Sequence, residues 1–539
     1  MSESSILARR RRLSPIASIA ALTASVALAL AACTPGEAET TGSPGADGDD
    51  GATAAASVGG TFAVGQRQAP TNLDPATANP PSYVFPAYEP LIYQEADGTL
   101  VPALATAWGY TDDTMTSFEV TLREGVVFSD GDALDAEAVK GSLDRFLTTE
   151  GPNAAYAGPV ESIEATGDDT VVIHYSTAFP VAALSLSQDW RFGLIVSPTG
   201  VANPEALATE SHGAGQYVLD SSATIDGSAY TYTVNENYWN ADAVKFDEVV
   251  LTVMADSNAQ LAALESGQID YANNPDTLTV ATAVDEGFVS VPSSGGIWLL
   301  MLVGRDDEPL SDPAVREAIG YALDREGIAA AAFQGSAVPI GSLAQEGRPG
   351  DYGATAVERD LDRVAELLDG AGYGDGISLT VLAIDGIDPN FSFSSAVQAQ
   401  LTEAGIDAEL LQATGSFEAF LEPLFGGEAD IAAWRFSDID TYYQFVQNLV
   451  PAGTLANPFG STDEALAAAL TTAGSASDLD AAMQEVATVY DELFWSIPVV
   501  LTTEGQLFSD RVANLPTEFA PQTPNAFSPD PANSWELID

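Results

Sequence analysis

Hydrophobic and polar residues recur along this chain with two alternating periods, which predict helices and strands in turn. The segment "SDPAVREAIGYALDREG" (311–327) places Val315, Ile319, Ala322 and Leu323 on one helical face. Asp312 is the expected N-cap of that helix, and Pro313 fits its first turn. The segment "LDAEAVKGSLDRFL" (134–147) repeats this pattern after Asp135. Both segments therefore predict amphipathic helices that pack one face on a core.

Helices are followed by a glycine and then by a strand at several places. "LDRVAELLDGAGY" (361–373) ends in glycines before the apolar run "ISLTVLAI" (377–384), and "AVQAQLTEAGIDAELL" (396–411) has the same order. Such alternation favours an α/β fold with helices packed on mixed or parallel sheets. We see no fixed-period repeat, which disfavours a solenoid.

The N-terminus carries the signals of an exported chain. Arg9 to Arg12 form a basic block before the apolar run 13–32, as in a secretion signal. The run is also long enough for a membrane anchor helix. The sequence Leu30-Ala31-Ala32-Cys33 resembles the processing box of bacterial lipoproteins, which implies cleavage before Cys33 and lipidation of its thiol. We expect a signal peptide at 1–32 and a flexible acidic tether at 33–59.

Size, charge and cysteine usage narrow the classes of function. The 539 residues exceed what one hydrophobic core supports, so two or more domains are expected. The formal net charge of −60 disfavours binding to nucleic acids. Cys33 is the only cysteine, which excludes an intramolecular disulfide and a cysteine-based zinc site.

No familiar catalytic or metal motif is present. His174 and His212 are the two histidines, and they lack the spacing of a zinc site. The serine-hydrolase elbow, the phosphate-binding P-loop and the calcium loop are also absent. We therefore expect no cofactor, no metal and no catalytic residue. A hydrolase that uses two of the many carboxylates stays open as an alternative.

A series of segments resembles the extracellular solute-binding proteins of ABC importers, in the family for oligopeptides, dipeptides and nickel (solute-binding protein family 5). The segments "YEPLIYQEADGTLVPALATAW" (88–108) and "FEVTLREGVVFSDGDALDAEAV" (118–139) carry most of the resemblance. It continues through "GAGQYVL", "NENYWN", "ALESGQID" and "VREAIGYALDRE" in the same order. The resemblance extends from about residue 60 to the C-terminus.

The resemblance implies a two-lobed α/β fold of the periplasmic-binding-protein type, type II, with an extra subdomain and hinge strands between the lobes. Lobe I would comprise 60–290 and 501–539, with an inserted subdomain at about 83–190. Lobe II would comprise 291–500. The segments "SVPSSGGIWLLMLV" (290–303) and "SIPVVLTTEG" (496–505) are the candidate crossing strands.

Ligand-binding residues are also suggested by the resemblance. Peptide-binding members have a tryptophan in the second lobe, followed three residues on by an aspartate that pairs with the ammonium group of the ligand. Here Trp434 is followed at that position by Ser437, whereas Asp438 and Asp440 come one and three residues later. The candidate ligand-binding residues are Tyr83, Trp298, Trp434, Arg435, Asp438, Asp440 and Tyr442.

Each of these residues also has a structural interpretation. Trp434 fits a core tryptophan at a strand end, and the two aspartates fit a solvated loop. Arg316 and Arg325 lie beside carboxylates in the sequence and are expected to form ion pairs with them.

The sequence thus predicts a lipid-anchored, monomeric receptor outside a bacterial membrane, which binds a peptide or other small polar solute and delivers it to an ABC permease. The negative field mildly favours neutral or cationic solutes. A secreted lipoprotein hydrolase and a scaffold or chaperone that uses the same cleft are the alternatives.

Overall fold

A computed structural model describes residues 59–273, 275–305, 308–334, 336–436, 440–476, 478–516 and 526–538. These residues all belong to one unit of the chain, which begins at residue 56. The predicted signal peptide, most of the tether and the predicted lipidation site Cys33 lie outside the described residues.

An eleven-stranded sheet connects the two lobes. Its order is β15-β14-β16-β12-β17-β11-β1-β10-β9-β8, with β13 paired to β17. β1 pairs in parallel with β10 and β11, and β14 pairs in parallel with β15 and β16. The strands are β1 (Thr61–Gln66), β8 (Tyr217–Leu219), β9 (Ala229–Val234), β10 (Glu248–Val253), β11 (Tyr271–Asn273), β12 (Val289–Leu302), β13 (Ala337–Pro339), β14 (Ile377–Ile384), β15 (Ile406–Ala413), β16 (Ile431–Phe436) and β17 (Ser496–Phe508).

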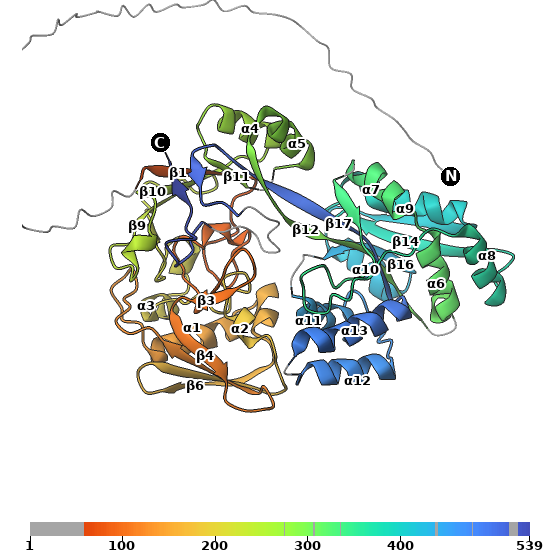
Figure 1. The fold of residues 1–539 in the computed structure, drawn as a ribbon, viewed down its shortest axis with the longest axis horizontal. Coiled ribbons are helices and arrows are strands. Elements are labelled where there is room, and N and C mark those ends of the chain that lie inside the picture. Colours follow the sequence, from red (N-terminus) through yellow and green to blue (C-terminus); the bar gives the residue numbers. More distant parts are fainter. Residues whose placement is uncertain are drawn as a thin grey trace, which may run out of the picture. The chain divides into compact units, whose positions relative to one another are not determined.

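The two long strands β12 and β17, here called the crossing strands, run antiparallel through the middle of this sheet (Figure 1). At one end β17 pairs with β11, and at the other end β12 pairs with β16. We call the part containing β1 and β8–β11 the first lobe and the part containing β14–β16 the second lobe. The crossing strands are those predicted from the sequence, whereas the exact lobe limits stay a prediction.

A second sheet belongs to the first lobe. Its order is β4-β5-β7-β6, entirely antiparallel, and helix α1 (Ala136–Thr148) packs on β6 and β7. These elements fall within the subdomain expected at 83–190, and the limits of that subdomain remain untested. The strands are β4 (Ala105–Tyr110), β5 (Ser117–Leu122), β6 (Val160–Thr166) and β7 (Thr170–Tyr175); the short pairs are β2 (Ile92–Gln94) with β3 (Leu100–Pro102) and β18 (Val512–Ala513) with β19 (Glu536–Leu537).

Helices begin where the sequence predicts. The carboxylates of Asp135 and Asp312 accept hydrogen bonds from the main-chain N–H groups of Ala138 and Ala314 in the first turns of α1 and α6, which confirms both N-caps. The remaining helices are α2 (Ala182–Ser185), α3 (Pro198–Ala202), α4 (Ser257–Glu265), α5 (Thr277–Glu286), α6 (Pro313–Ala322), α7 (Arg325–Phe333), α8 (Leu361–Gly370), α9 (Ser392–Glu403), α10 (Glu418–Gly426), α11 (Thr441–Tyr443), α12 (Glu464–Ala473) and α13 (Leu479–Leu493).

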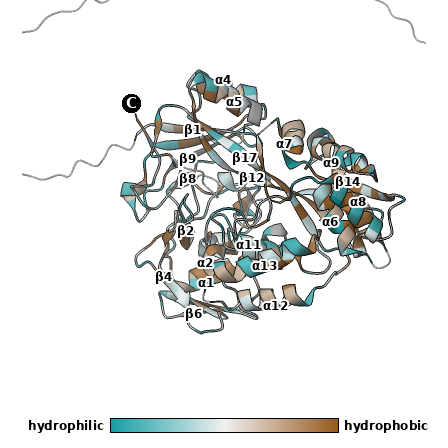
Figure 2. Ribbon diagram, turned by 45° about the vertical axis from the view of Figure 1, so that its right-hand side comes forward, coloured by the Kyte–Doolittle hydropathy of each residue, from teal (hydrophilic) through white to brown (hydrophobic). Residues whose placement is uncertain are grey.

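Hydrophobic clusters fill each lobe, and a further cluster contains buried residues of both lobes, such as Trp190 and Tyr443. In the first lobe Phe62 stacks on Phe246 and Tyr271 stacks on Phe508, with Trp535 set edge-on against them. In the second lobe the predicted face of α6 is buried against the sheet. Figure 2 shows both hydrophobic and hydrophilic residues on the helices that flank the sheet, as expected for helices with one buried face.

The buried side chains of Arg316 and Arg325 have other partners than the sequence predicts. Arg316 donates to the carbonyls of Leu310, Ser311 and Leu493, and Arg325 donates to those of Gly320, Val357 and Pro498. Among the described residues neither arginine forms an ion pair with a neighbouring carboxylate, so this prediction is wrong, although the charge of Asp312 still acts on Arg316. Both guanidinium groups instead satisfy main-chain carbonyls, because a planar group with five donors can reach several chain segments that meet in the fold.

Among the described residues, no helix is both long and apolar enough to span a lipid bilayer.

Candidate functional site

The end of β16 carries two of the predicted ligand-binding residues. Trp434 is 9% exposed and contacts Phe417 and Phe420, with ring centroids 5.8 and 5.0 Å away. Arg435, the next residue, turns to the crossing strands. Its Nη1 donates to the carbonyl of Gly295 at 2.9 Å and lies 3.3 Å from Glu504 Oε1. The structure thus gives Trp434 aromatic partners and Arg435 a polar contact with both crossing strands.

Two other candidates are buried among aromatic side chains. Trp298 on β12 is 6% exposed, packs between Phe333 and Phe393, and its buried indole N–H has no hydrogen-bond partner. Tyr83 is 1% exposed, and its hydroxyl donates to the carbonyl of Gln68. A solute would reach either residue only after these contacts open.

The remaining predicted residues lie just after β16. Asp440 is buried, and its carboxylate accepts from the N–H of Tyr443 as the N-cap of α11. Tyr442 is also buried, and burial together with the charge of Asp440 raises the pKa of its hydroxyl to about 12. Asp438 lies outside the described residues. All of these ligand-binding assignments stay predictions.

The side chains of Tyr156 and Trp190 in the first lobe meet Tyr443 of the second lobe. Tyr443 lies 4.8 Å from Trp190 and 5.4 Å from Tyr156, and these two rings are 5.9 Å apart. We call this group of three rings the aromatic seam. In the part of the chain that the structure describes, aromatic side chains from both lobes pack directly on one another here.

Charged groups surround the aromatic seam. Burial raises the pKa of Asp189 to about 6, although the guanidinium groups of Arg191 and Arg348 lower it. The charges of Arg191 and Asp189 also act on the hydroxyl of Tyr156. Arg191 adopts a left-handed backbone with φ of 63°, and its Nη1 donates to the carbonyl of Ala78 at 2.7 Å. The seam therefore combines aromatic faces with both signs of charge, as pockets for polar solutes do.

The aromatic seam was not predicted from the sequence. Tyr442 rather than Tyr443 was a candidate ligand-binding residue, and Tyr156, Asp189 and Trp190 were not candidates. A signal was present, since "SQDWRF" (187–192) combines aspartate, tryptophan and arginine as "AAWRFSDIDTYY" does. The sequence alone does not show that these two segments, some 250 residues apart, come together in the fold.

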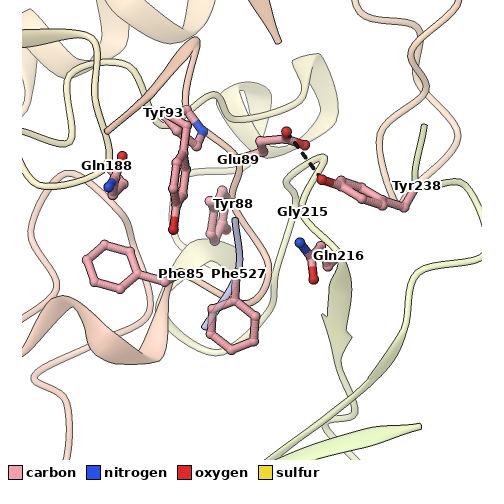
Figure 3. A pocket seen from close by; sticks show the side chains of 10 residues that line it. Phe85, Tyr88, Glu89, Tyr93, Gln188, Gly215, Gln216, Tyr238 and Phe527 are labelled. Atoms are coloured by element: carbon pink, nitrogen blue, oxygen red, sulfur yellow. Dashed lines mark hydrogen bonds between the residues drawn. The ribbon is translucent and has the colours of Figure 1, made fainter. Parts of the chain in front are cut away.

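A small cavity in the first lobe is lined in part by Tyr88 and Glu89, which precede β2 (Figure 3). Its volume is about 10 Å³, which is room for one water molecule. Tyr88, Tyr93, Gln188 and Phe527 surround it, and the carboxyl group of Glu89 accepts from Tyr238 and Trp239 beside it. A cavity this size does not hold a solute.

A larger cavity, of about 40 Å³, lies where the parallel strands β1 and β11 end. Gln66 and Asn273 are paired at the carboxyl ends of these strands, which is the edge where open α/β sheets bind ligands. Its polar side chains form a connected hydrogen-bond network, from Ser82 through Gln66 and Asn273 to Tyr271.

Comparison with known proteins identifies the family. The family model for bacterial extracellular solute-binding proteins, family 5 middle region, matches residues 99–453. This chain belongs to that family. The glutathione-binding protein GsiB of Salmonella paratyphi A is 26% identical over 359 residues, which cover 63% of this chain and 67% of that protein.

Solved structures share the fold over nearly the whole chain. The periplasmic binding protein AgaA of A. tumefaciens R10, in complex with agropinic acid, has a TM-score of 0.72 and 21% identity, covering 89% of this chain and 99% of AgaA. DppA of Helicobacter pylori, in complex with the peptide STSA, has a TM-score of 0.68 and 21% identity, covering 89% and 98%. The predicted two-lobed α/β fold is confirmed.

Family membership also decides the class of function. Proteins of this family bind solutes outside the cell and deliver them to ABC importers, and they are not enzymes. The chain is therefore a solute-binding receptor, as predicted, and not the hydrolase that its many carboxylates left open.

Proposed function

We propose that this receptor is monomeric, is tied to the outer face of the cell membrane by lipid on Cys33, and closes its two lobes around a peptide-type solute at the aromatic seam. The N-terminal basic block, the apolar run and the Leu-Ala-Ala-Cys sequence support the lipid anchor. The relatives named for glutathione and the structure solved with a peptide support a solute with a peptide backbone.

The observation that carries the proposal is the packing of Tyr443 against Trp190 and Tyr156. Aromatic faces from both lobes bury more surface when the lobes are closed, and a solute held between them adds contacts that only the closed state makes. Such a solute shifts the population towards closure by its differential affinity for the two states.

The charged side chains near the aromatic seam also influence which solutes can bind. Asp189, Arg191 and Arg348 bring both signs of charge to this region. Since Asp189 and Arg348 already have partners in the structure, the charged ends of a peptide would replace these contacts. These local charges outweigh the negative field of the whole chain at short range, since exposed charges are screened beyond about 8 Å at physiological salt.

Native mass spectrometry of the full chain, purified in mild detergent from a bacterial host, tests this proposal. We expect a protein that begins at residue 33 with added acyl chains, together with a bound molecule of peptide size that is released on denaturation. Adding that molecule back at 100-fold its Kd should stabilise the fold by about 2.7 kcal/mol. A chain that retains residues 1–32, or one that neither carries nor responds to any peptide, would refute the proposal.

A further inference from the structure

The cavity at the ends of β1 and β11 is built from neutral groups. Its volume of about 40 Å³ is room for about three water molecules, or a group of about four heavy atoms. The aromatic faces of Phe62, Tyr271 and Trp535 form its walls, while Gln66, Ser82 and Asn273 supply its polar atoms. No charged side chain lines it among the described residues.

Hydrogen bonds fix the orientation of the Gln66 side chain. Its Oε1 accepts from Asn273 Nδ2 at 2.8 Å and from Ser82 Oγ at 3.2 Å. Asn273 Oδ1 lies 3.1 Å from the Tyr271 hydroxyl, whose single proton is also within reach of Gln506 Oε1. Both acceptor positions of the Gln66 amide oxygen are thus used, and the amide nitrogen lies in the same plane on the opposite side of Cδ.

The Gln66 amide nitrogen, Nε2, is a donor without an acceptor. Gln66 is 3% exposed, and within the described part of the chain its Nε2 donates no hydrogen bond. Nε2 is not among the fully enclosed polar atoms that lack a partner, so it keeps some accessible surface. Since Gln66 lines the cavity, an acceptor placed there would satisfy this donor.

The groups around the cavity limit which kind of acceptor can bind beside Gln66. The Glu504 carboxylate lies near enough to Tyr271 for its charge to add to the burial that raises the pKa of the tyrosine hydroxyl, so a negative charge on the same side is disfavoured. An ammonium group has no lone pair for Gln66 Nε2. Ser82 Oγ donates to Gln66 and keeps lone pairs that can accept an N–H. A neutral group with one acceptor and one donor fits these requirements.

We propose that this cavity is a binding pocket for a small neutral carboxamide group, whose carbonyl oxygen accepts from Gln66 Nε2 and whose N–H donates to Ser82 Oγ. The planar group lies between the aromatic walls, where its faces bury apolar surface. In the receptor, the carboxamide would belong to the solute, and for that assignment the inference rests on the proposed function. The pocket thereby favours solutes with an amide side chain or a comparable neutral amide.

Methyl-labelled NMR of the full chain tests the pocket directly, with acetamide as the probe. Val64 and Leu251 line the cavity, so their methyl resonances report on its occupation. We expect acetamide to shift both sets of resonances saturably, and acetate, which has the same size and a negative charge, to bind at least tenfold more weakly. Equal affinity for acetate and acetamide, or no saturable shift up to 1 M acetamide, would overturn the inference.

Two variants assign the effect to Gln66. Q66L should weaken acetamide binding at least tenfold, while Q94L, which changes another buried glutamine of the first lobe, should leave it unchanged. If Q66L changes the methyl spectrum of the whole protein, S82A is the alternative, because it removes the predicted acceptor with a smaller change of side chain. We expect S82A to weaken acetamide binding at least threefold. Unchanged affinity in S82A and in a folded Q66L would refute the pocket. This outcome leaves the mass-spectrometric test of the solute unaffected, because that test does not depend on this cavity.

Discussion

Glu89 illustrates how a single residue of this fold responds to its environment. Its side chain is 5% exposed, and it accepts hydrogen bonds from Trp239 Nε1 at 2.9 Å and from the Tyr238 hydroxyl at 3.3 Å. The Arg123 guanidinium lies over the Trp239 ring, 3.6 Å from its centroid. Burial raises the pKa of Glu89 to about 8, because these hydrogen bonds and the Arg123 charge offset the lost hydration only in part.

We expect the stability of the wild-type chain to fall between about pH 4.5 and pH 8 as a result. The native state holds a proton on Glu89 that the unfolded state has already released above its ordinary pKa of 4.5, so the stabilisation is complete below that value and is lost as the pH rises through 8. The loss is on the order of 3–5 kcal/mol, at 1.36 kcal/mol per pKa unit. E89Q should flatten this part of the profile in denaturation curves measured from pH 4 to pH 9. An identical pH profile in E89Q would show that Glu89 is not the titrating group.

At the scale of elements, the pairing of the crossing strands is irregular at two places, and the bend at the first of them involves glycine. Their pairing register shifts between Ser294 and Gly296, which marks a β-bulge. Gly296 has φ of 122°, and a Cβ there would lie 2.8 Å from the carbonyl oxygen of Phe436. The Arg435 side chain covers the bulge through its bond to the Gly295 carbonyl. The bend therefore needs glycine both for its backbone angle and for the close approach of β16.

We expect G296A to destabilise the chain by about 2–3 kcal/mol, since it adds both backbone strain and a steric clash. The matched control is G267A, at the end of α4, where φ is 70° and nothing lies within 4 Å of an added Cβ. That variant carries backbone strain alone and should cost about 1–2 kcal/mol. Urea denaturation measures the free energy of unfolding of both variants. An equal decrease in the two variants would show that the clash at the bulge is relieved without a loss of stability.

At the scale of the whole molecule, the aromatic seam couples the two lobes. Tyr443 follows β16 in the second lobe, while Tyr156 and Trp190 belong to the first. Contacts that exist only when the lobes are together stabilise the closed state relative to the open one. The seam should therefore affect both the shape of the free receptor and its affinity for solute.

We expect Y443A to open the free receptor, and small-angle X-ray scattering should record a larger radius of gyration than for the wild type. Y443F keeps the ring and its contacts with Trp190 and Tyr156, so it should scatter like the wild type. Loss of the ring should also weaken solute binding, because closure then provides less buried surface. Scattering curves of Y443A that superimpose on those of the wild type would contradict a role of the seam in closure.

Much of the local structure could be predicted from the sequence, because it depends on neighbouring residues. The N-caps Asp135 and Asp312, the strand at 377–384 and the helix–glycine–strand order at 396–411 all follow from side-chain period and turn chemistry within a few residues. Partners in the tertiary structure were harder to predict. Arg316 and Arg325 donate to carbonyls of distant segments, and Tyr443 packs on Trp190 of the other lobe. Local spacing contains no information about such partners.

The sequence by itself determined the order of helices and strands, the exclusion of the familiar catalytic motifs and, through its segments, the family. The tertiary structure decided which side chains meet. It brought Tyr443 to Trp190, placed Arg435 against the crossing strands, and put Gln66 on the wall of a cavity that no charged side chain lines among the described residues. The physical reason is that helix and strand periods depend on contacts within a few residues, whereas a binding site depends on contacts between segments that only the folded chain brings together.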